Sequence, residues 1–171
     1  SGIGRALADA FKHAGYSVWA CARKANDVDA LNVAGFIGVQ LDVNDEDAVA
    51  QLGERLQRET GRLDVLVNNA GYGAMGPLLD GGTDALRRQF ETNVFSLIGL
   101  TRACFPVLRA SRGLVVNIGS VSSVLVTPFA GAYCASKAAV HAISDALRLE
   151  LAPFAIEVME VQPGAIRSEE R

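Results

Sequence analysis

Short apolar segments alternate with longer amphipathic segments along the chain. Each short segment consists mostly of aliphatic or aromatic residues and ends in a polar or turn-forming cluster, a pattern that predicts β-strands. The middle segment contains three consecutive aliphatic residues, which is typical of a parallel strand covered by helices on both faces. The strands are predicted at residues 16–22, 36–41, 63–69, 114–118 and 156–161.

The longer segments repeat their apolar residues with the period of an α-helix. Helices are predicted at residues 5–14, 46–60, 83–109 and 132–151. Gly15 is suited to end the first helix, and the cluster at 42–45 is suited to cap the second. Because strands alternate with helices and no repeat or linker interrupts them, we expect one α/β domain with a doubly wound parallel sheet.

The composition is that of an ordinary folded domain. The chain has 171 residues, of which 50% are hydrophobic, so it can bury a sizeable core. Sixteen basic and nineteen acidic side chains give a net charge of -3 without a basic stripe, and no nucleic-acid partner is expected. Residues 113–136 carry no charge, but polar residues and Pro128 interrupt them. A strand followed by a loop is therefore expected there, and no membrane span.

The cysteines and histidines are isolated in the sequence. Cys21, Cys104 and Cys134 form no C-x-x-C pair, and His13 and His141 lie far apart among apolar and small residues. This spacing argues against a disulfide framework and against a thiolate metal cluster. No metal site is predicted, a reducing cytoplasm is the expected compartment, and the two histidines are interpreted as helix-surface or core residues.

Ligands of a doubly wound sheet bind beyond the carboxyl ends of its strands, so the residues that follow each strand are candidates for function. Gly2 and Gly4 precede the first predicted helix, where free N–H groups and the helix dipole attract a phosphate. Residues 68–71, Asn-Asn-Ala-Gly, follow a central strand and let a ligand lie against the backbone. A plain helix cap and a polar turn are the alternative interpretations of these two segments.

The most informative group is Ser120 at the end of one strand, with Tyr133 and Lys137 on the next predicted helix. A spacing of four residues puts Tyr133 and Lys137 on one face of that helix. A phenol is a poor base at neutral pH, but a nearby cation favours the phenolate, with an attraction of about 4 kcal/mol at about 4 Å. Ser120 can hold a carbonyl oxygen while Tyr133 transfers the proton. Because no side chain carries a hydride, this chemistry requires a cofactor.

Taken together, these residues resemble the short-chain dehydrogenases/reductases, in their ordinary single-domain branch. The resemblance implies a Rossmann-like fold, and its motifs occur in the family's order over almost the whole chain. They are S-G-I-G at 1–4, L-D-V at 41–43, N-N-A-G at 68–71, Asn93 within F-E-T-N-V, Ser120, Y-C-A-S-K at 133–137 and P-G at 163–164.

The resemblance implies a role for each matching residue. Tyr133 would be the general acid/base, and Lys137 would bind the nicotinamide ribose and favour the phenolate form of Tyr133. Ser120 would orient the substrate oxygen, and Asn93 would hold a water that links Lys137 to solvent. Besides Tyr133 and Lys137, the implied cofactor contacts are Gly2, Ile3 and Gly4 at the pyrophosphate, Asp42 and Val43 at the adenine, Asn68, Ala70 and Gly71 at the adenosine side of the cleft, and Pro163, Gly164 and Ile166 at the nicotinamide.

The choice of cofactor depends on the residues after the first predicted strand. Relatives that prefer NAD place an acidic residue there for the ribose hydroxyls, whereas this chain has Ala22 followed by Arg23 and Lys24. Two cations attract a 2'-phosphate that a carboxylate would repel, so NADP(H) is favoured over NAD(H). A solvated turn is the alternative interpretation of Arg23 and Lys24.

The chain departs from the family's pattern at both ends. The strand and Thr-Gly that precede S-G-I-G in the family are absent, and the chain stops at Arg171, before the segment that covers the substrate in relatives. We therefore expect one Rossmann-like domain over residues 1–171 that is truncated at both ends, and catalysis is predicted for the parent protein. The family also implies a homodimer or homotetramer of that parent. Alanines of the predicted helix 132–151 would serve this contact or packing on the sheet.

The apolar segment 124–130 indicates a hydrophobic carbonyl compound or alcohol as the substrate. The stretches V-Q-P-G-A-I and G-Y-G-A-M-G-P-L are similar to bacterial oxidoreductases that resemble hydroxysteroid, retinol and acyl-dihydroxyacetone-phosphate reductases. The leading hypothesis is an NADP(H)-dependent carbonyl reductase or alcohol dehydrogenase. The alternatives are an NAD-dependent hydroxysteroid or retinol-type dehydrogenase and a nucleotide-binding regulator without turnover. Sugar-nucleotide epimerisation is disfavoured by N-N-A-G, and thiol catalysis by Cys134 is disfavoured because no histidine is placed to activate it.

Overall fold

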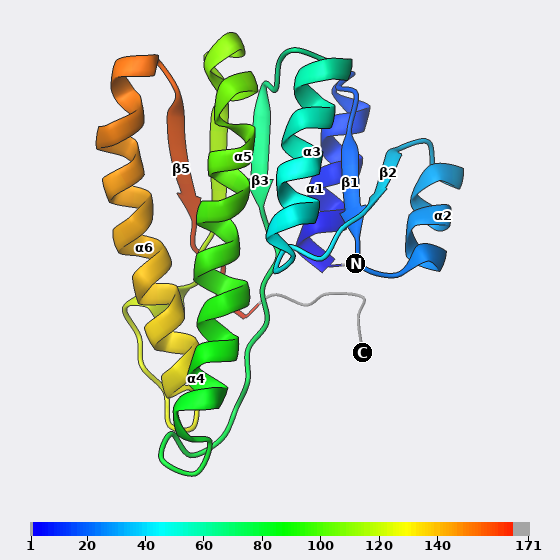
Figure 1. The fold of residues 1–171 in the computed structure, drawn as a ribbon. Coiled ribbons are helices and arrows are strands. Elements are labelled where there is room, and N and C mark those ends of the chain that lie inside the picture. The colour runs from blue at the N-terminus through cyan, green and yellow to red at the C-terminus, as the bar shows by residue number, and fades with distance from the viewer. Residues whose placement is uncertain (1, 166–171) are drawn as a thin grey trace.

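Helices and strands alternate along residues 2–165, the part of the chain that the computed structural model describes (Figure 1). The five predicted strands are confirmed, each within its predicted range. They are β1 (Trp19–Ala22), β2 (Ile37–Gln40), β3 (Val65–Asn68), β4 (Leu114–Ile118) and β5 (Glu157–Val161). The α-helices are α1 (Gly2–His13), α2 (Ala25–Val33), α3 (Glu46–Glu59), α4 (Gly82–Phe90), α5 (Ser96–Ser111) and α6 (Gly131–Leu151).

All strand pairs are parallel, but the strands form two sheets where one continuous sheet was expected. β1 pairs with β2, and β4 pairs with β3 on one side and β5 on the other. Among residues 2–165 no backbone hydrogen bonds join β1 to β3, and this divides the sheet. The parallel α/β class is confirmed, whereas the missing first strand of the family stays a prediction.

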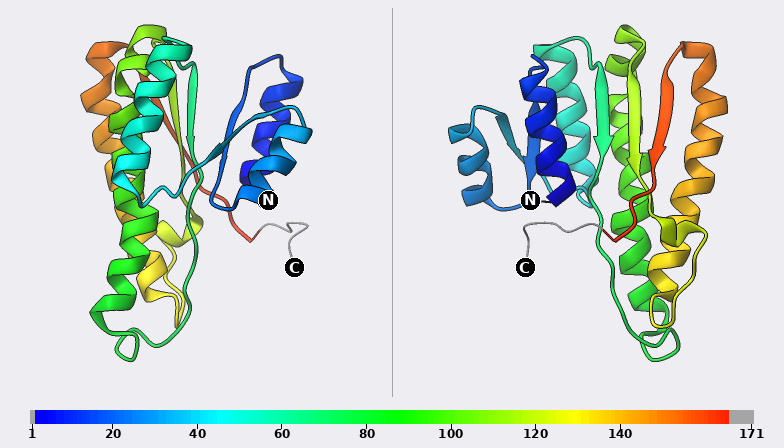
Figure 2. Two further views of the ribbon diagram at one scale, coloured as in Figure 1. Left: turned by 45° about the vertical axis from the view of Figure 1, so that its right-hand side comes forward. Right: turned by 180° about the vertical axis from the view of Figure 1, so that it is seen from behind.

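The helices cover the two faces of the larger sheet unequally. α5 packs on β3 and β4, α6 packs on β5, and α3 packs against α5. Figure 2 shows these helices on one side of β3, β4 and β5, while α1 lies on the opposite side of the molecule. The burial of β3 alternates accordingly, because Leu66 is buried whereas Val65 and Val67 are half-exposed. Among the described residues, the face of β3 that carries Val65 and Val67 is therefore less completely covered than the face that carries Leu66.

The core lies between the larger sheet and helices α3 and α5. Its buried side chains come from the strands and from the facing stripes of the two helices, as expected for amphipathic helices on a sheet. Asp45 begins α3 by accepting a hydrogen bond from the Ala48 amide with its side chain, which confirms the predicted capping cluster. The members of the core include Leu52, Leu56, Leu66, Cys104, Val107, Leu108, Val115, Ile156 and Val158.

The helix predicted at residues 83–109 is interrupted by a π-helical turn. α4 is followed by the π-helix η1 (Glu91–Phe95) and then by α5. A π-turn inserts an extra residue into the helix and is frequent at functional sites. Asn93 lies in this turn and is buried. The periodicity of apolar residues did not reveal the interruption.

Two helical features were absent from the predicted elements. α2 was not predicted, and none of its residues is buried, so it has no continuous apolar stripe that a pattern could reveal. α1 begins at Gly2 instead of Arg5, so Gly2, Ile3 and Gly4 form its first turn. Short 3-10 turns, η2 (Val121–Ser123) and η3 (Ala152–Phe154), follow β4 and α6.

Replacing Gly53 by alanine is expected to lower the free energy of unfolding by about 1–3 kcal/mol. Gly53 lies where α3 approaches α5, and an added Cβ would lie 2.5 Å from the carbonyl oxygen of Ala103, which is backbone and cannot easily move. Gly99 on α5 has no described atom within 4 Å of such a Cβ. Urea denaturation should therefore show that Gly99→Ala has no cost, or stabilises by up to about 1 kcal/mol. Equal effects of the two substitutions would contradict this close packing.

Candidate active site

Ser120 lies at the carboxyl end of β4, where the chain turns into η2. Its side chain is buried, and Oγ accepts a hydrogen bond of 3.1 Å from the backbone amide of Ser122. The next amide, of Val121, donates to the carbonyl oxygen of Pro163 at 3.1 Å. These contacts fix the hydroxyl of Ser120 and tie the end of β4 to the segment that follows β5.

Tyr133 and Lys137 lie one turn apart near the start of α6, as the four-residue spacing predicts. Tyr133 is half-buried, whereas Lys137 is only 7% exposed. The ammonium nitrogen of Lys137 lies 5.9 Å from the centre of the Tyr133 ring and donates a hydrogen bond of 2.7 Å to the carbonyl oxygen of Ile118 in β4. The structure thus holds a buried cation beside the phenol at the end of the strand that leads to Ser120.

The charge of Lys137 is subject to two opposing influences. Burial lowers the pKa of its ammonium group below the usual value of a lysine, and the negative charge of Glu160 on β5 raises it. Burial is the larger of the two influences. Functional sites often contain such a group, in which burial disfavours the charged form and a nearby carboxylate favours it.

Asn93 holds the segment after β3 against this site. Its amide nitrogen donates to the carbonyl oxygen of Tyr72 at 3.0 Å and to Ser136 Oγ at 2.9 Å, and its oxygen accepts from the Tyr72 amide at 3.0 Å. Gly71 passes so close that an added Cβ would lie 3.1 Å from Asn93 Oδ1 and 3.8 Å from Lys137 Nζ. Asn93, Gly71 and Lys137 are therefore brought together, whereas the role of Asn93 in holding a water stays a prediction.

Asn68 and Asn117 occupy opposite positions of β3 and β4 and form a buried polar network. The amide nitrogen of Asn68 donates to Asn117 Oδ1 at 2.9 Å and to Thr101 Oγ1 at 3.0 Å. The amide nitrogen of Asn117 donates to Ser144 Oγ on α6 at 2.9 Å. The side chain of Asn68 thus joins strands to helices, while its Oδ1 is buried and has no partner among residues 2–165.

The candidate cofactor residues lie at the carboxyl ends of the strands or at the start of α1. Arg23 and Lys24 are exposed between β1 and α2, and Asp42 is exposed after β2. Gly4 lies beside Asn69, since an added Cβ at Gly4 would be 2.5 Å from the amide nitrogen of Asn69. The helix start is thereby placed next to the segment Asn-Asn-Ala-Gly, which includes Ala70. Val43, Pro163 and Gly164 also follow their strands, and Ile166 lies outside the described residues.

Several polar residues of the site were not found by reasoning from the sequence. Gln89 is fully buried, accepts from the Ala74 amide at 2.9 Å and donates to the Tyr72 carbonyl oxygen. Glu160 is buried beneath α6, and His141 binds it. In the sequence, the presence of a charged residue within a predicted apolar strand could have indicated that Glu160 has a special role. The interpretation of His141 as an ordinary surface or core residue missed this contact.

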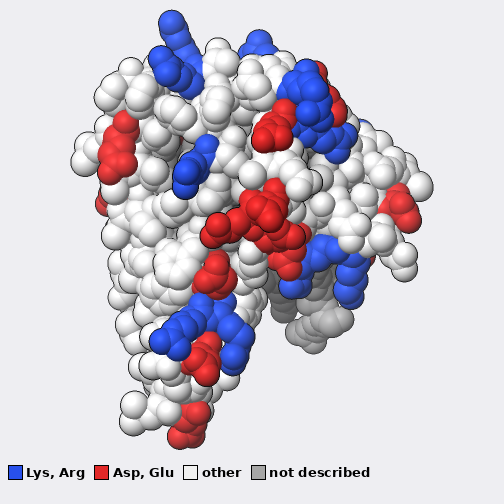
Figure 3. All heavy atoms as spheres, viewed as in Figure 1, with Lys and Arg blue, Asp and Glu red and all other residues white. Residues whose placement is uncertain are grey.

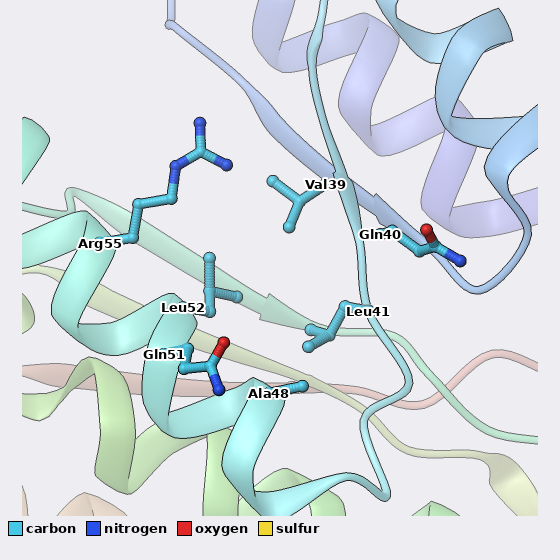
Figure 4. Close-up of a pocket in the computed structure, with 7 residues that line it drawn as sticks. All are labelled: Val39, Gln40, Leu41, Ala48, Gln51, Leu52 and Arg55. Atoms are coloured by element: carbon cyan, nitrogen blue, oxygen red, sulfur yellow. The ribbon is translucent and has the colours of Figure 1, made fainter.

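Two other surface features lie apart from Tyr133. A hollow of about 170 Å³ between β2 and α3 has Arg55 as its one charged lining residue, so it offers no acid and base pair (Figure 4). The basic side chains on the face shown in Figure 3 occur in separate groups, with acidic groups between them. Among residues 2–165 no group of three histidine, cysteine or acidic side chains is placed to hold a metal ion.

Residues 82–111 are long and apolar enough to cross a membrane by length and composition alone. In this structure the segment comprises α4, η1 and α5, and α5 packs on α3 and the larger sheet. A third of its most apolar window is buried, and one such helix is a weak indication of a membrane span.

The geometry and the motifs agree with the comparison to known proteins. The family model of the short chain dehydrogenases matches residues 1–171. The chain belongs to this family. The chain is 41% identical to short-chain dehydrogenase ptmH of Penicillium ochrochloron, over 98% of this chain and 62% of that protein. It is 36% identical to the NADPH-dependent 1-acyldihydroxyacetone phosphate reductase of Schizosaccharomyces pombe over 98% of this chain and 57% of that protein.

Solved structures confirm the Rossmann fold of the short-chain dehydrogenases. The crystal structure of a short-chain dehydrogenase from Streptomyces avermitilis is similar with a TM-score of 0.93 and 39% identity, over 99% of this chain and 64% of that one. A metagenomic short-chain oxidoreductase in complex with NADP is similar with a TM-score of 0.88 and 30% identity, over 98% of this chain and 80% of that one. The chain spans about three fifths of the length of the curated relatives it matches.

Proposed function

We propose that the full-length protein is an NADP(H)-dependent oxidoreductase that interconverts a carbonyl compound and a secondary alcohol. The observation that carries this proposal is the buried ammonium group of Lys137, held beside Tyr133 at the end of the strand that leads to Ser120. A buried cation is costly unless a reaction or a partner needs its charge. Here its positive charge would stabilise the oxygen of Tyr133 once that oxygen has given up its proton to the substrate.

The proposed reaction assigns one task to each side chain. In the direction of reduction, Ser120 donates a hydrogen bond to the carbonyl oxygen and orients it, and Tyr133 transfers its phenolic proton to that oxygen. Lys137 stabilises the phenolate that remains on Tyr133. A nicotinamide cofactor held at the strand ends would supply the hydride for the carbonyl carbon. In the direction of oxidation, the phenolate of Tyr133 accepts the proton of the alcohol.

The residues at the strand ends suit a dinucleotide phosphate. The start of α1 carries free amides and two small residues, and it lies against Asn69 of the neighbouring segment. Arg23 and Lys24 are exposed after β1, where their charges are free to attract a 2'-phosphate. Solved relatives in complex with NADP support the same preference. We therefore propose NADP(H) as the cofactor, with NAD(H) as the weaker alternative.

Replacing Arg23 by alanine is expected to raise the KM for NADPH about tenfold and to leave the KM for NADH almost unchanged. A hydrogen bond between charged groups contributes about 1.5–3 kcal/mol, and tenfold corresponds to about 1.4 kcal/mol. Only NADPH carries the phosphate, so the effect should depend on the cofactor. Arg58, exposed near the end of α3, provides the matched control variant Arg58→Ala. A parallel rise of both KM values would contradict recognition of the phosphate by Arg23.

We propose an apolar substrate, because hydrophobic side chains gather on the segments that flank Tyr133. Val124, Leu125, Val126 and Phe129 are all exposed between η2 and α6. The carbonyl oxygen of Phe129 accepts from the amide of Gly76 at 2.8 Å, so the exposed segment around Met75 lies beside them. Two relatives are named for reduction of 1-acyldihydroxyacetone phosphate and of 3-ketodihydrosphingosine. A panel of apolar and small polar ketones assayed with NADPH tests the proposal, and equal turnover of both kinds would contradict it.

We further propose that the full-length protein is a homodimer or homotetramer in the cytoplasm. Phe95 at the end of η1 and Ile98 in α5 are exposed, and a hollow of about 200 Å³ between α4 and η1 is lined by apolar side chains and Arg87. Apolar surface of this kind is typical of a protein interface. Light scattering of the purified protein measures the oligomeric state. The cysteines Cys21, Cys104 and Cys134 are free, as a reducing compartment would leave them.

A further inference from the structure

A second group of polar side chains lies behind Lys137, between β5 and α6. At its centre is Glu160, whose side chain is only 6% exposed. Its Oε2 accepts from His141 Nδ1 at 2.6 Å and from Gln162 Nε2 at 3.0 Å. Its Oε1 is buried and has no hydrogen-bond partner among the described residues. A buried carboxylate with one unpaired oxygen is costly and needs a physical explanation.

The unpaired oxygen lies against the backbone segment that leads from β4 to Ser120. It lies against Gly119, because a Cβ added to Gly119 would overlap Glu160 Oε1. Gly119 stands between Ile118, whose carbonyl oxygen binds the ammonium group of Lys137, and Ser120. The negative charge of Glu160 is therefore buried next to the segment that holds Lys137.

His141 connects this carboxylate to solvent. Tyr133, Lys137 and His141 follow one another at intervals of four residues on α6, so they share one stripe of the helix. The side chain of His141 is 43% exposed, in contrast to that of Glu160. His141 can therefore gain or lose a proton at ordinary pH while it stays in contact with the buried carboxylate.

We propose that Glu160 and His141 are positioning residues of the active site: Glu160 stabilises the ammonium charge of Lys137, and the charge of His141 controls how strongly Glu160 does so. When His141 is protonated, the pair is neutral and Lys137 experiences little net charge from it. When His141 is neutral, the carboxylate is uncompensated and supports the buried cation. The inference rests on the proposed function, because the charge of Lys137 acts on Tyr133 only in the proposed reaction.

The charges around the pair are consistent with this coupling. The hydrogen bond and the charge of Glu160 raise the pKa of His141, Asp145 on α6 also raises it, and Arg148 on α6 lowers it. Asp145 Oδ2 is 4.0 Å from His141 Nε2 and forms an ion pair with Arg148, which offsets its charge. The loss of the proton from His141 is thus expected above its usual pH, and the support for Lys137 increases across that transition.

The experiment follows the Lys137 side chain directly by NMR in the full-length protein with 13Cε- and 15Nζ-labelled lysine, and its signal is assigned by its loss in Lys137→Arg. Glu160→Gln keeps the size of the side chain and removes its charge, so we expect the pKa of Lys137 to fall by about one unit. In the wild type, the Lys137 signal should also show a smaller inflection in the range where His141 titrates. That inflection should be absent in His141→Gln and in Glu160→Gln.

His13→Gln is the matched control, because His13 is exposed on α1 and binds the carbonyl oxygen of Asp9, away from Lys137. It should keep the inflection and the pKa of Lys137. An unchanged pKa of Lys137 in Glu160→Gln, or an inflection that persists in His141→Gln, would overturn the inference. If Glu160→Gln does not fold, His141→Gln decides by the inflection alone.

The pH profile of kcat/KM provides a readout that a purely structural role would not change. The wild type should show the inflection of His141 in this profile, and His141→Gln should lose it with KM for the cofactor within about twofold of the wild type. A uniform drop in activity with the inflection retained would also overturn the inference. Because the NMR titration needs no turnover, its result is separate from a failure of the proposed reaction.

Discussion

Replacing Tyr133 by phenylalanine is expected to lower kcat of the full-length protein about 1000-fold while NADP(H) still binds. The substitution removes one oxygen atom, and with it the proton that the carbonyl oxygen must receive. A positioned general acid or base contributes roughly 10²–10⁴-fold to a rate. Tyr133 is half-buried, and its ring remains in place beside Gly73, so the phenylalanine should fit without rearrangement.

The measurement is steady-state oxidation of NADPH with an apolar ketone, combined with a fluorescence titration of cofactor binding. Tyr16→Phe is the matched control, because Tyr16 is 46% exposed and packs on Phe11, away from the site. It should keep full activity. Turnover by Tyr133→Phe within tenfold of the wild type would contradict the assignment of the proton to Tyr133. If the wild type binds cofactor but reduces and oxidises nothing in the panel, the alternative of a nucleotide-binding regulator gains support.

Replacing Asn117 by alanine is expected to lower the free energy of unfolding by about 2–4 kcal/mol, since a buried polar network loses its central member. Asn117 is fully buried and joins Asn68 on β3 to Ser144 on α6. The substitution removes two hydrogen bonds and leaves a cavity. It should also loosen the contact between β4 and the helix that carries Tyr133 and Lys137.

Urea denaturation measures this loss. Asn44→Ala is the matched control, because the side chain of Asn44 is exposed and makes one hydrogen bond, to Thr92. Its effect should lie within about 0.5 kcal/mol. The double variant Asn117→Ala, Ser144→Ala should lose less than the sum of the two single variants, because both remove the same hydrogen bond. A loss of less than about 1 kcal/mol for Asn117→Ala would show that water replaces the network.

The positions of the strands were predictable because each strand is a short apolar run that ends in a turn-forming cluster. The register between them was not predictable, because it depends on which residues face each other across different segments. Asn68, Asn117 and Glu160 occupy one row across β3, β4 and β5. Only this alignment shows that two amides and a carboxylate share a buried layer beneath the helices.

The candidate site was predictable as far as its chemistry lies close together in the sequence. The spacing of Tyr133 and Lys137 fixes their common helix face, and the structure confirms it. The partner of Lys137 could not be deduced, because Ile118 is apolar and contributes a backbone oxygen. The partner of Asn93 could not be deduced either, since Asn93 binds the backbone of Tyr72, which is distant in the sequence.

The sequence alone determined the α/β class, the strands, the ends of α3 and α6 and the common helix face of Tyr133 and Lys137, because these depend on local periodicity, capping and spacing. Tertiary structure alone decided the register between the strands, the burial of Lys137 and the pairing of His141 with Glu160. Burial and charge pairing arise when distant segments exclude water from the same volume. A local sequence pattern does not show which distant segments come together, so the electrostatics of the site can be described only for the folded molecule.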